Sequence, residues 1–176
     1  MMSTKKSSTI TFRLDQEIDI ALRSLAEEKK ISLNTLANQI LGNYLQLELY
    51  MEKFGVLMMS KDTFRILLST IDEKDLIKIA LEAGSSEPKE FILFKWKEIN
   101  SDIVTKFIKI YLDHCGYGTC DITKKGSKIT VSIIHSLGKK GSIYIKFFLE
   151  SLIRSTLDKS CETVTNKELL SLTFTE

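Results

Sequence analysis

Five side chains in this sequence carry the nitrogen and sulfur atoms that bind transition metals most readily: His114, Cys115, Cys120, His135 and Cys161. A zinc site needs about four such ligands, each roughly 2.1–2.3 Å from one ion. A hairpin that turns at residues 125–126 would place Cys120 opposite Val131. Cys120 would then lie about 13 Å along the sheet from His135, at roughly 3.3 Å per residue. A compact four-ligand site is therefore not expected, and both histidines with Cys115 remain only weak candidates for a three-ligand site. We predict no resident metal or other cofactor.

A second group of residues could bind an anion at the start of a helix. It occupies the segment that joins a predicted strand to a predicted buried helix: His135, Gly138, Lys139, Lys140, Gly141 and Ser142. The lysines supply positive charge, and the helix start supplies amides without partners, so a phosphate or carboxylate would fit. The spacing matches neither a Walker A motif nor a dinucleotide fingerprint. A solvated turn that requires positive φ angles explains the same residues, and both interpretations stay open.

No arrangement of residues in the sequence is typical of catalysis. Neither paired carboxylates nor a nucleophile beside a base occurs at a recognisable spacing. Catalysis would have to depend on His135 or His114 alone. We therefore expect a binding protein and not an enzyme.

Composition indicates an ordinary globular protein. The chain has 176 residues, of which 43% are hydrophobic and 27% charged, with a formal net charge of +2. These values exclude disorder, collagen-like repeats and a disulfide-dense secreted scaffold. No transmembrane or signal segment is expected, and three cysteines without a secretion signal favour a cytoplasmic location. The net charge is too small to indicate nucleic-acid binding by itself.

The first fifty residues show a strand pattern followed by two helix patterns. Ile10, Phe12 and Leu14 alternate with polar residues, which predicts a strand with one buried face. A first helix is expected after Asp15, and a longer one after Ser32, continuing as far as residue 53. One strand cannot pair with itself, and so small a core is marginal. We therefore expect a homodimer in which two strands pair antiparallel.

This order of elements resembles the ribbon-helix-helix family of prokaryotic DNA-binding proteins. The resemblance covers roughly residues 8–47, about a quarter of the chain, and depends on pattern and spacing. It implies an N-terminal DNA-binding domain, residues 1–53, that forms a homodimer through its strand and helices. The function implied is a transcription regulator, a repressor of this family's type, which reads the major groove of double-stranded DNA with a two-stranded ribbon.

Two sets of DNA contacts follow from the resemblance. The side chains expected at base edges are Thr9, Thr11 and Arg13. The groups expected at phosphates are the start of the second helix and the N-terminal arm: Ser32, Leu33, Asn34, Lys5 and Lys6. An arginine guanidinium can bind guanine O6 and N7 together, and helix N-termini attract anions. Residues 1–53 hold seven basic and seven acidic residues, so we expect modest, salt-sensitive affinity.

The pattern of residues 54–176 predicts a second, α+β domain that mediates assembly or binds a ligand. Helices are expected at 61–70, 72–83, 101–115 and 141–158. Strands are expected at 56–59, 117–123, 128–136, 161–165 and 169–174, and the clearest loop at 84–88. Residues 91–99 are ambiguous. This order predicts an antiparallel sheet with helices on one face.

Two other functions remain open. In the first, the N-terminal domain serves only to dimerise, and the second domain binds a partner protein, as an antitoxin would. In the second, the C-terminal domain senses a metal or a metabolite. Binding to random-sequence DNA at low salt would separate the DNA-binding hypothesis from the first alternative.

Overall fold

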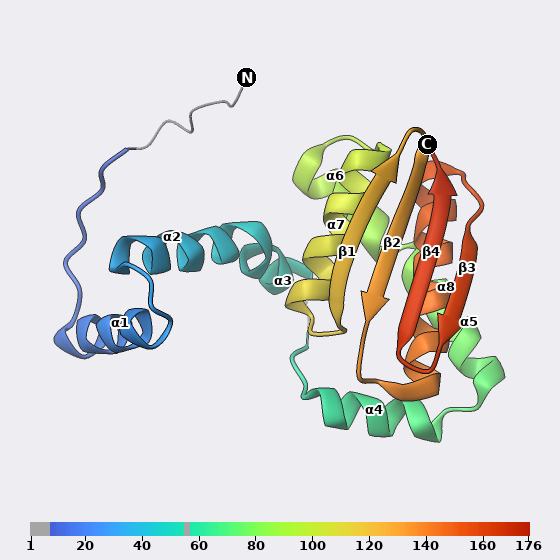
Figure 1. The fold of residues 1–176 in the computed structure, drawn as a ribbon, viewed down its shortest axis with the longest axis horizontal. Helices are drawn as coiled ribbons and strands as arrows, with labels where there is room; N and C mark the ends of the chain where they lie inside the picture. Colours follow the sequence, from blue (N-terminus) through green and yellow to red (C-terminus); the bar gives the residue numbers. More distant parts are fainter. Residues whose placement is uncertain (1–7, 55–56) are drawn as a thin grey trace. The chain divides into compact units, whose positions relative to one another are not determined.

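The computed structural model describes residues 8–54 and 57–176 and divides the chain into two compact units, Met1–Glu48 and Leu49–Glu176 (Figure 1). Sequence analysis placed this boundary between residues 53 and 54. The structure places it earlier because helix α3 (Leu49–Phe54) packs with the C-terminal unit. The ring of Tyr50 in α3 lies 5.4 Å from the ring of Phe91, centre to centre.

The described part of the N-terminal unit contains two helices and a π-helical turn. Helix α1 spans Gln16–Glu28, helix α2 spans Leu33–Asn43, and the π-helical turn Tyr44–Glu48 continues α2. Helix α2 begins where sequence analysis expected it, because Ser32 Oγ accepts a hydrogen bond of 3.0 Å from the amide of Thr35. Such a cap satisfies one of the amides that have no acceptor within the helix.

The structure contradicts the ribbon-helix-helix fold expected for the N-terminal region. Residues 8–15 form neither strand nor helix, and α1 is the first regular element of the described chain. The alternation of Ile10, Phe12 and Leu14 fits a strand. A strand also requires a neighbour whose amides and carbonyls complete a hydrogen-bonded ladder. Within the described ranges no segment pairs with residues 8–15, so the prediction of a two-stranded ribbon was wrong.

The C-terminal unit contains the remaining helices. After α3 they are α4 (Lys61–Thr70), α5 (Glu73–Ser85), α6 (Glu87–Trp96), α7 (Ser101–His114) and α8 (Gly138–Leu157). Ser60, Asp72 and Asn100 cap the amides that begin α4, α5 and α7. None of the helices that the structure describes is long and apolar enough to span a membrane.

Four antiparallel strands form one sheet in the order β1-β2-β4-β3. The strands are β1 (Thr119–Lys125), β2 (Lys128–Ile134), β3 (Glu162–Asn166) and β4 (Leu169–Thr175). The hairpins β1–β2 and β3–β4 each close with a two-residue turn, and β2 pairs with β4 at the centre. The unit is therefore α+β with an antiparallel sheet.

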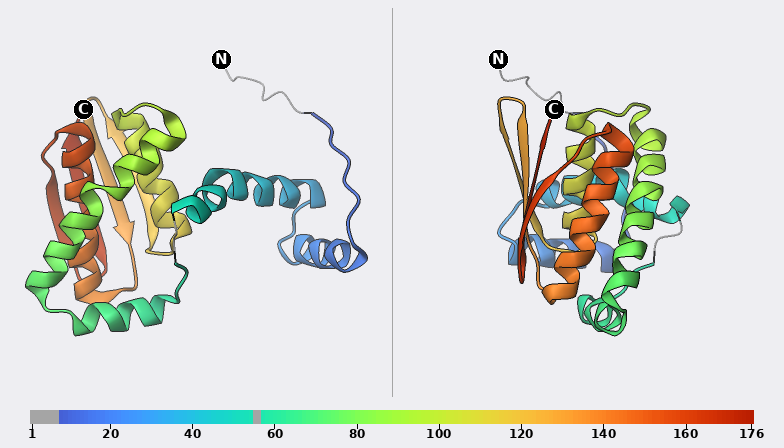
Figure 2. Two further views of the ribbon diagram at one scale, coloured as in Figure 1. Left: turned by 180° about the vertical axis from the view of Figure 1, so that it is seen from behind. Right: turned by 90° about the vertical axis from the view of Figure 1, so that its right-hand side faces the viewer.

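The helices of the C-terminal unit lie on one side of the sheet, as the nearly edge-on view in Figure 2 shows. Alternate strand residues point toward the helices and are buried: Ile129, Val131, Ile133, Leu170, Leu172 and Phe174. Helix α8 packs against β3, β4 and α5 and buries a second set: Ile145, Phe148, Leu149, Leu152 and Ile153. The opposite face of the sheet carries mainly polar side chains.

Several local predictions for this unit differ from the structure. Helix α8 begins at Gly138 and not at residue 141. Residues 84–88 are not a loop, since α5 ends at Ser85 and α6 begins at Glu87 with Pro88 in its first turn, where proline is tolerated. Residues 57–60 are neither strand nor helix, and residues 55–56 lie outside the described ranges. The β1–β2 register places Cys120 opposite Ile133 and not Val131, because the turn is at residues 126–127. A shift of two residues leaves each side chain on its expected face.

Gly84 permits the close approach of α5 to α8. A Cβ at this position would overlap the carbonyl oxygen of Phe148. We therefore expect Gly84→Ala to lower the free energy of unfolding by about 1–3 kcal/mol, despite the better helix propensity of alanine. Gly42 in α2 is the matched control, since a Cβ added there would meet no other atom of the protomer within 4 Å. Gly42→Ala should raise that free energy by up to about 1 kcal/mol. Urea denaturation of both variants measures the two effects, and equal values would contradict the packing argument.

Candidate functional site

The segment before α1 displays the side chains predicted to contact bases: Thr9, Thr11 and Arg13. All three are exposed, and none of them has a side-chain hydrogen bond or ion pair within the described part of the chain. Arg13 differs in this respect from Arg23, whose guanidinium lies 2.9 Å from a carboxylate oxygen of Asp19. Lys5 and Lys6, predicted as phosphate contacts, lie outside the described residues.

The predicted phosphate-binding residues Ser32, Leu33 and Asn34 meet at the first turn of α2. The hydroxyl of Ser32 is engaged as the helix cap, whereas the amides of Leu33 and Asn34 have no acceptor among the residues described. No acidic side chain lies in this turn, so no carboxylate offsets the positive end of the helix dipole. The turn can therefore donate hydrogen bonds to an anion.

The loop between β2 and α8 is built around His135, which is only 4% exposed. The amide of Leu137 donates to its Nδ1 at 3.2 Å, so the proton is on Nε2, which donates to Ser142 Oγ at 2.9 Å. Ser142 Oγ in turn donates toward the carbonyl oxygens of Lys167 and Asn166, at 3.0 and 3.2 Å. Burial lowers the pKa of His135. The histidine is therefore neutral and joins the loop to the β3–β4 turn.

The other five predicted anion-binding residues lie at the start of α8, and besides Ser142 two of them have structural partners. Gly141 lies against Leu137, and Lys140 Nζ donates to the carbonyl oxygen of Ile71. Only Gly138 and Lys139 line an open hollow of about 660 Å³. Its other lining residues come from β2 and the β3–β4 turn: Ile134, Asn166, Lys167, Glu168 and Leu169. Four of the six predicted residues therefore have structural partners, and two line the open hollow.

The three weak metal candidates do not form a cluster. His114 Nδ1 lies 3.0 Å from the carbonyl oxygen of Ile110, and His135 is held by Ser142. Burial raises the pKa of the Cys115 thiol to about 11, which disfavours the thiolate form that binds metals. In the described ranges no group of three or more histidine, cysteine or acidic side chains could hold a metal ion.

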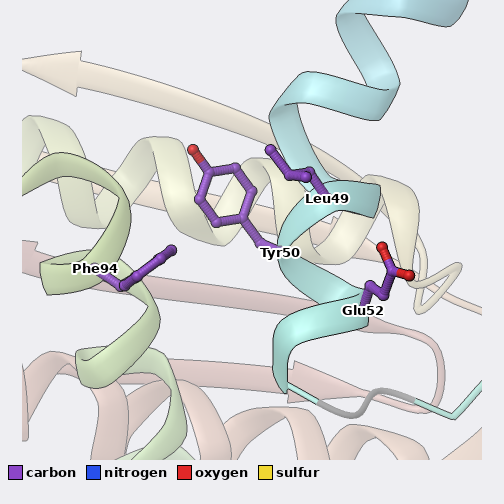
Figure 3. Close-up of a pocket in the computed structure, with 4 residues that line it drawn as sticks. All are labelled: Leu49, Tyr50, Glu52 and Phe94. Atoms are coloured by element: carbon purple, nitrogen blue, oxygen red, sulfur yellow. The ribbon is translucent and has the colours of Figure 1, made fainter.

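Sequence reasoning missed a hollow of about 630 Å³ in the C-terminal unit, lined by Leu49, Tyr50 and Glu52 of α3 and by Phe94 of α6 (Figure 3). The rings of Tyr50 and Phe94 approach edge to face, 5.9 Å apart. Beside them, Lys95 Nζ lies 4.2 Å from the centre of the Tyr50 ring. Partial burial and the charge of Lys106 lower the pKa of Lys95 to about 8, while the facing rings favour its charged form. In the sequence, the aromatic and basic residues at 94–97 were the signal that could have indicated this hollow.

The structure also shows a stack of aromatic rings that the sequence did not indicate. Neighbouring rings lie nearly parallel at 5.3–6.3 Å between centres: Phe107, Tyr111, Tyr117, Tyr144 and Phe148. Burial raises the pKa of all three tyrosines above the usual value. The phenols are therefore neutral near pH 7, and they provide packing and hydrogen bonds without a phenolate base.

The neutral state of His135 predicts a loss of stability in acid. In the unfolded chain a histidine takes up its proton near pH 6.5, whereas burial resists protonation in the fold. The unfolded state then binds more protons, so stability should fall as the pH drops below about 6.5. Urea denaturation of wild type at several pH values measures this fall.

Two variants isolate the contribution of His135. In His135→Gln we expect a lower stability at neutral pH and a flatter dependence on pH. His114→Gln, which alters the only other histidine, should keep the wild-type slope. An unchanged slope in His135→Gln would refute the assignment.

Comparisons of the chain with protein-family models and with curated protein sequences find no match. The resemblance noted for residues 8–47 therefore depends on their residue pattern alone. Any functional assignment has to come from the exposed groups and their geometry in this chain.

Proposed function

We propose that this protein is a homodimeric DNA-binding transcription regulator whose N-terminal unit both dimerises and contacts DNA. The observation that carries the proposal is the composition of the exposed residues of this unit. One set of exposed side chains is apolar and requires a partner surface to bury it. The other set is polar or cationic and has no hydrogen-bonding or ionic partner in the described chain. The proposal does not require a strand at residues 8–14. The free thiols of Cys115, Cys120 and Cys161 are consistent with a cytoplasmic protein.

The apolar set supports dimerisation. The described part of the N-terminal unit buries three apolar side chains, those of Ala26, Leu36 and Leu47. It exposes nine large ones: Ile10, Phe12, Leu14, Ile18, Ile20, Ile40, Leu41, Tyr44 and Leu45. Ile10 and Phe12 are 68% and 60% exposed, which is unusual for large apolar residues of a monomer. A unit of fewer than 50 residues has a small core and is only marginally stable alone, and a second copy under twofold symmetry supplies a matching surface.

The polar set supports DNA as the ligand. Threonine hydroxyls and an arginine guanidinium are groups that hydrogen-bond to base edges in the grooves of DNA. Arg13 and the threonines at 9 and 11 lie on a segment, residues 8–14, that contains no acidic residue. The unpaired amides that begin α2 offer donors for a backbone phosphate. A twofold dimer would present two copies of each group to the duplex.

Leu41→Glu tests dimerisation. Leu41 in α2 is 45% exposed in the single chain, so the substitution should leave the protomer folded. Placing a carboxylate in an apolar interface should raise the dimer dissociation constant by at least about tenfold, since burial of one leucine stabilises by roughly 1.5–3 kcal/mol. Leu67→Glu is the matched control, because Leu67 in α4 is also a helical leucine and is 45% exposed. Sedimentation equilibrium of both variants gives the answer, and a monomeric wild type would refute the proposal of a dimer.

Arg13→Gln tests the DNA contact. A preferred site is first selected from random duplexes with the wild-type protein. The variant should bind this site more weakly than wild type, by about 1–3 kcal/mol of binding free energy, and show relaxed sequence preference. Arg23→Gln removes the same charge from the same unit, but Arg23 is paired with Asp19, so it should bind nearly as wild type does. Fluorescence anisotropy measures both affinities. Equal binding and equal sequence preference in wild type and Arg13→Gln would refute the base contact assigned to Arg13.

A further inference from the structure

The β1–β2 hairpin carries three lysines at its tip. Lys124 and Lys125 end β1, Lys128 begins β2, and the turn between them contains Gly126 with a φ of 60°. The turn lies at the end of the sheet beside the C-terminus of the described chain (Figure 1), where the amide of Glu176 donates to the carbonyl oxygen of Ser127. All residues of the tip, 124–128, are exposed.

The sheet separates these lysines onto two faces. Lys124 is opposite Ile129, which is buried against the helices, so Lys124 lies on the helix side. Its Nζ lies 2.8 Å from a carboxylate oxygen of Glu176 and 3.7 Å from one of Asp102. Lys125 and Lys128 pair directly with each other across the two strands and lie on the open face. Lys124 is therefore neutralised, whereas the other two are not.

Two like charges directly opposite each other on adjacent strands destabilise a hairpin. Within the described chain, Lys125 and Lys128 have no ion pair that would offset this repulsion. The strand residues beside them on the open face carry hydroxyls, including Thr123 and Thr130. Asp121 is the acidic residue on the open face of β1, four residues from Lys125, or about 13 Å along the strand. Glu162 lies on that face two strands away, on β3.

We propose that the tip of the β1–β2 hairpin is a second DNA-binding surface, where Lys125 and Lys128 contact backbone phosphates of the duplex. The inference rests on the proposed function, because it takes as its partner the DNA bound by the N-terminal unit. Two adjacent phosphates offset the repulsion between the two ammonium groups, and lysine binds phosphate as a compact charge. The tether between the units raises the effective concentration of DNA at the hairpin, so contacts that are weak alone become favourable.

The test uses the full-length chain and measures how its affinity for a labelled random-sequence duplex depends on salt. Each lost phosphate contact should reduce the slope of log affinity against log salt by about 0.9. Lys125→Gln/Lys128→Gln should therefore lower that slope by about 2 per bound protomer. Lys74→Gln/Lys78→Gln removes the same charge from exposed positions one turn apart on α5, and it should keep the wild-type slope. Thermal unfolding should show the hairpin variant at least as stable as wild type.

The outcomes distinguish this inference from the proposed function. A wild type that binds no DNA at low salt overturns both. If wild type and the hairpin variant bind DNA with the same slope of log affinity against log salt, the proposed function stands and the inference is overturned. Equal losses of slope in the two double variants also overturn it, because the effect is then one of net charge. Binding of polyglutamate that depends on these lysines, with an unchanged slope for DNA, would assign the hairpin to an acidic protein partner instead.

Discussion

The burial of helix α8 is the interaction on which the C-terminal unit depends. One side of the helix packs against α5 and the other packs toward the sheet, and Leu149, Leu152 and Ile153 are fully buried between them. Contact with α5 is close because Gly84 has no side chain at the point where it meets the backbone of α8. Ser151 Oγ adds a hydrogen bond to the carbonyl oxygen of Leu81 at the same contact. Strands β3 and β4 and helix α5 therefore have their positions set relative to a single helix.

Local signals in the sequence predicted most of the helix starts, because a capping side chain acts over only a few residues. Ser32 caps the helix expected after it, and Ser60 and Asp72 cap the helices found close to the ranges expected at 61–70 and 72–83. Pro88 was misleading, since a proline is compatible both with a loop and with the first turn of a helix. The lone N-terminal segment was wrongly read as a strand, because alternation describes side chains and says nothing about a backbone partner.

The candidate site was predictable only where neighbours in sequence are also neighbours in space. His135 continues the alternation of the buried residues Ile129, Val131 and Ile133 of β2, and it is itself buried. Its partner Ser142 could not be identified beforehand, because the path of the loop decides which residue of α8 faces the histidine. For Arg13 and the start of α2, the sequence supplied the chemistry, and the structure adds that these groups have no partner in the described chain. Lys125 and Lys128 became a pair only once the register of the hairpin was known.

Trp96 is the only tryptophan in the chain, and it lies in α6 beside Phe91 and Lys95. The segment up to Glu48 contains no tryptophan. Indole emission therefore reports on the C-terminal unit alone, while far-ultraviolet circular dichroism sums the helices of both units. A denaturation curve recorded by both signals would separate two transitions wherever the units unfold independently. For the proposed dimer, only the dichroism transition assigned to α1 and α2 would shift with protein concentration.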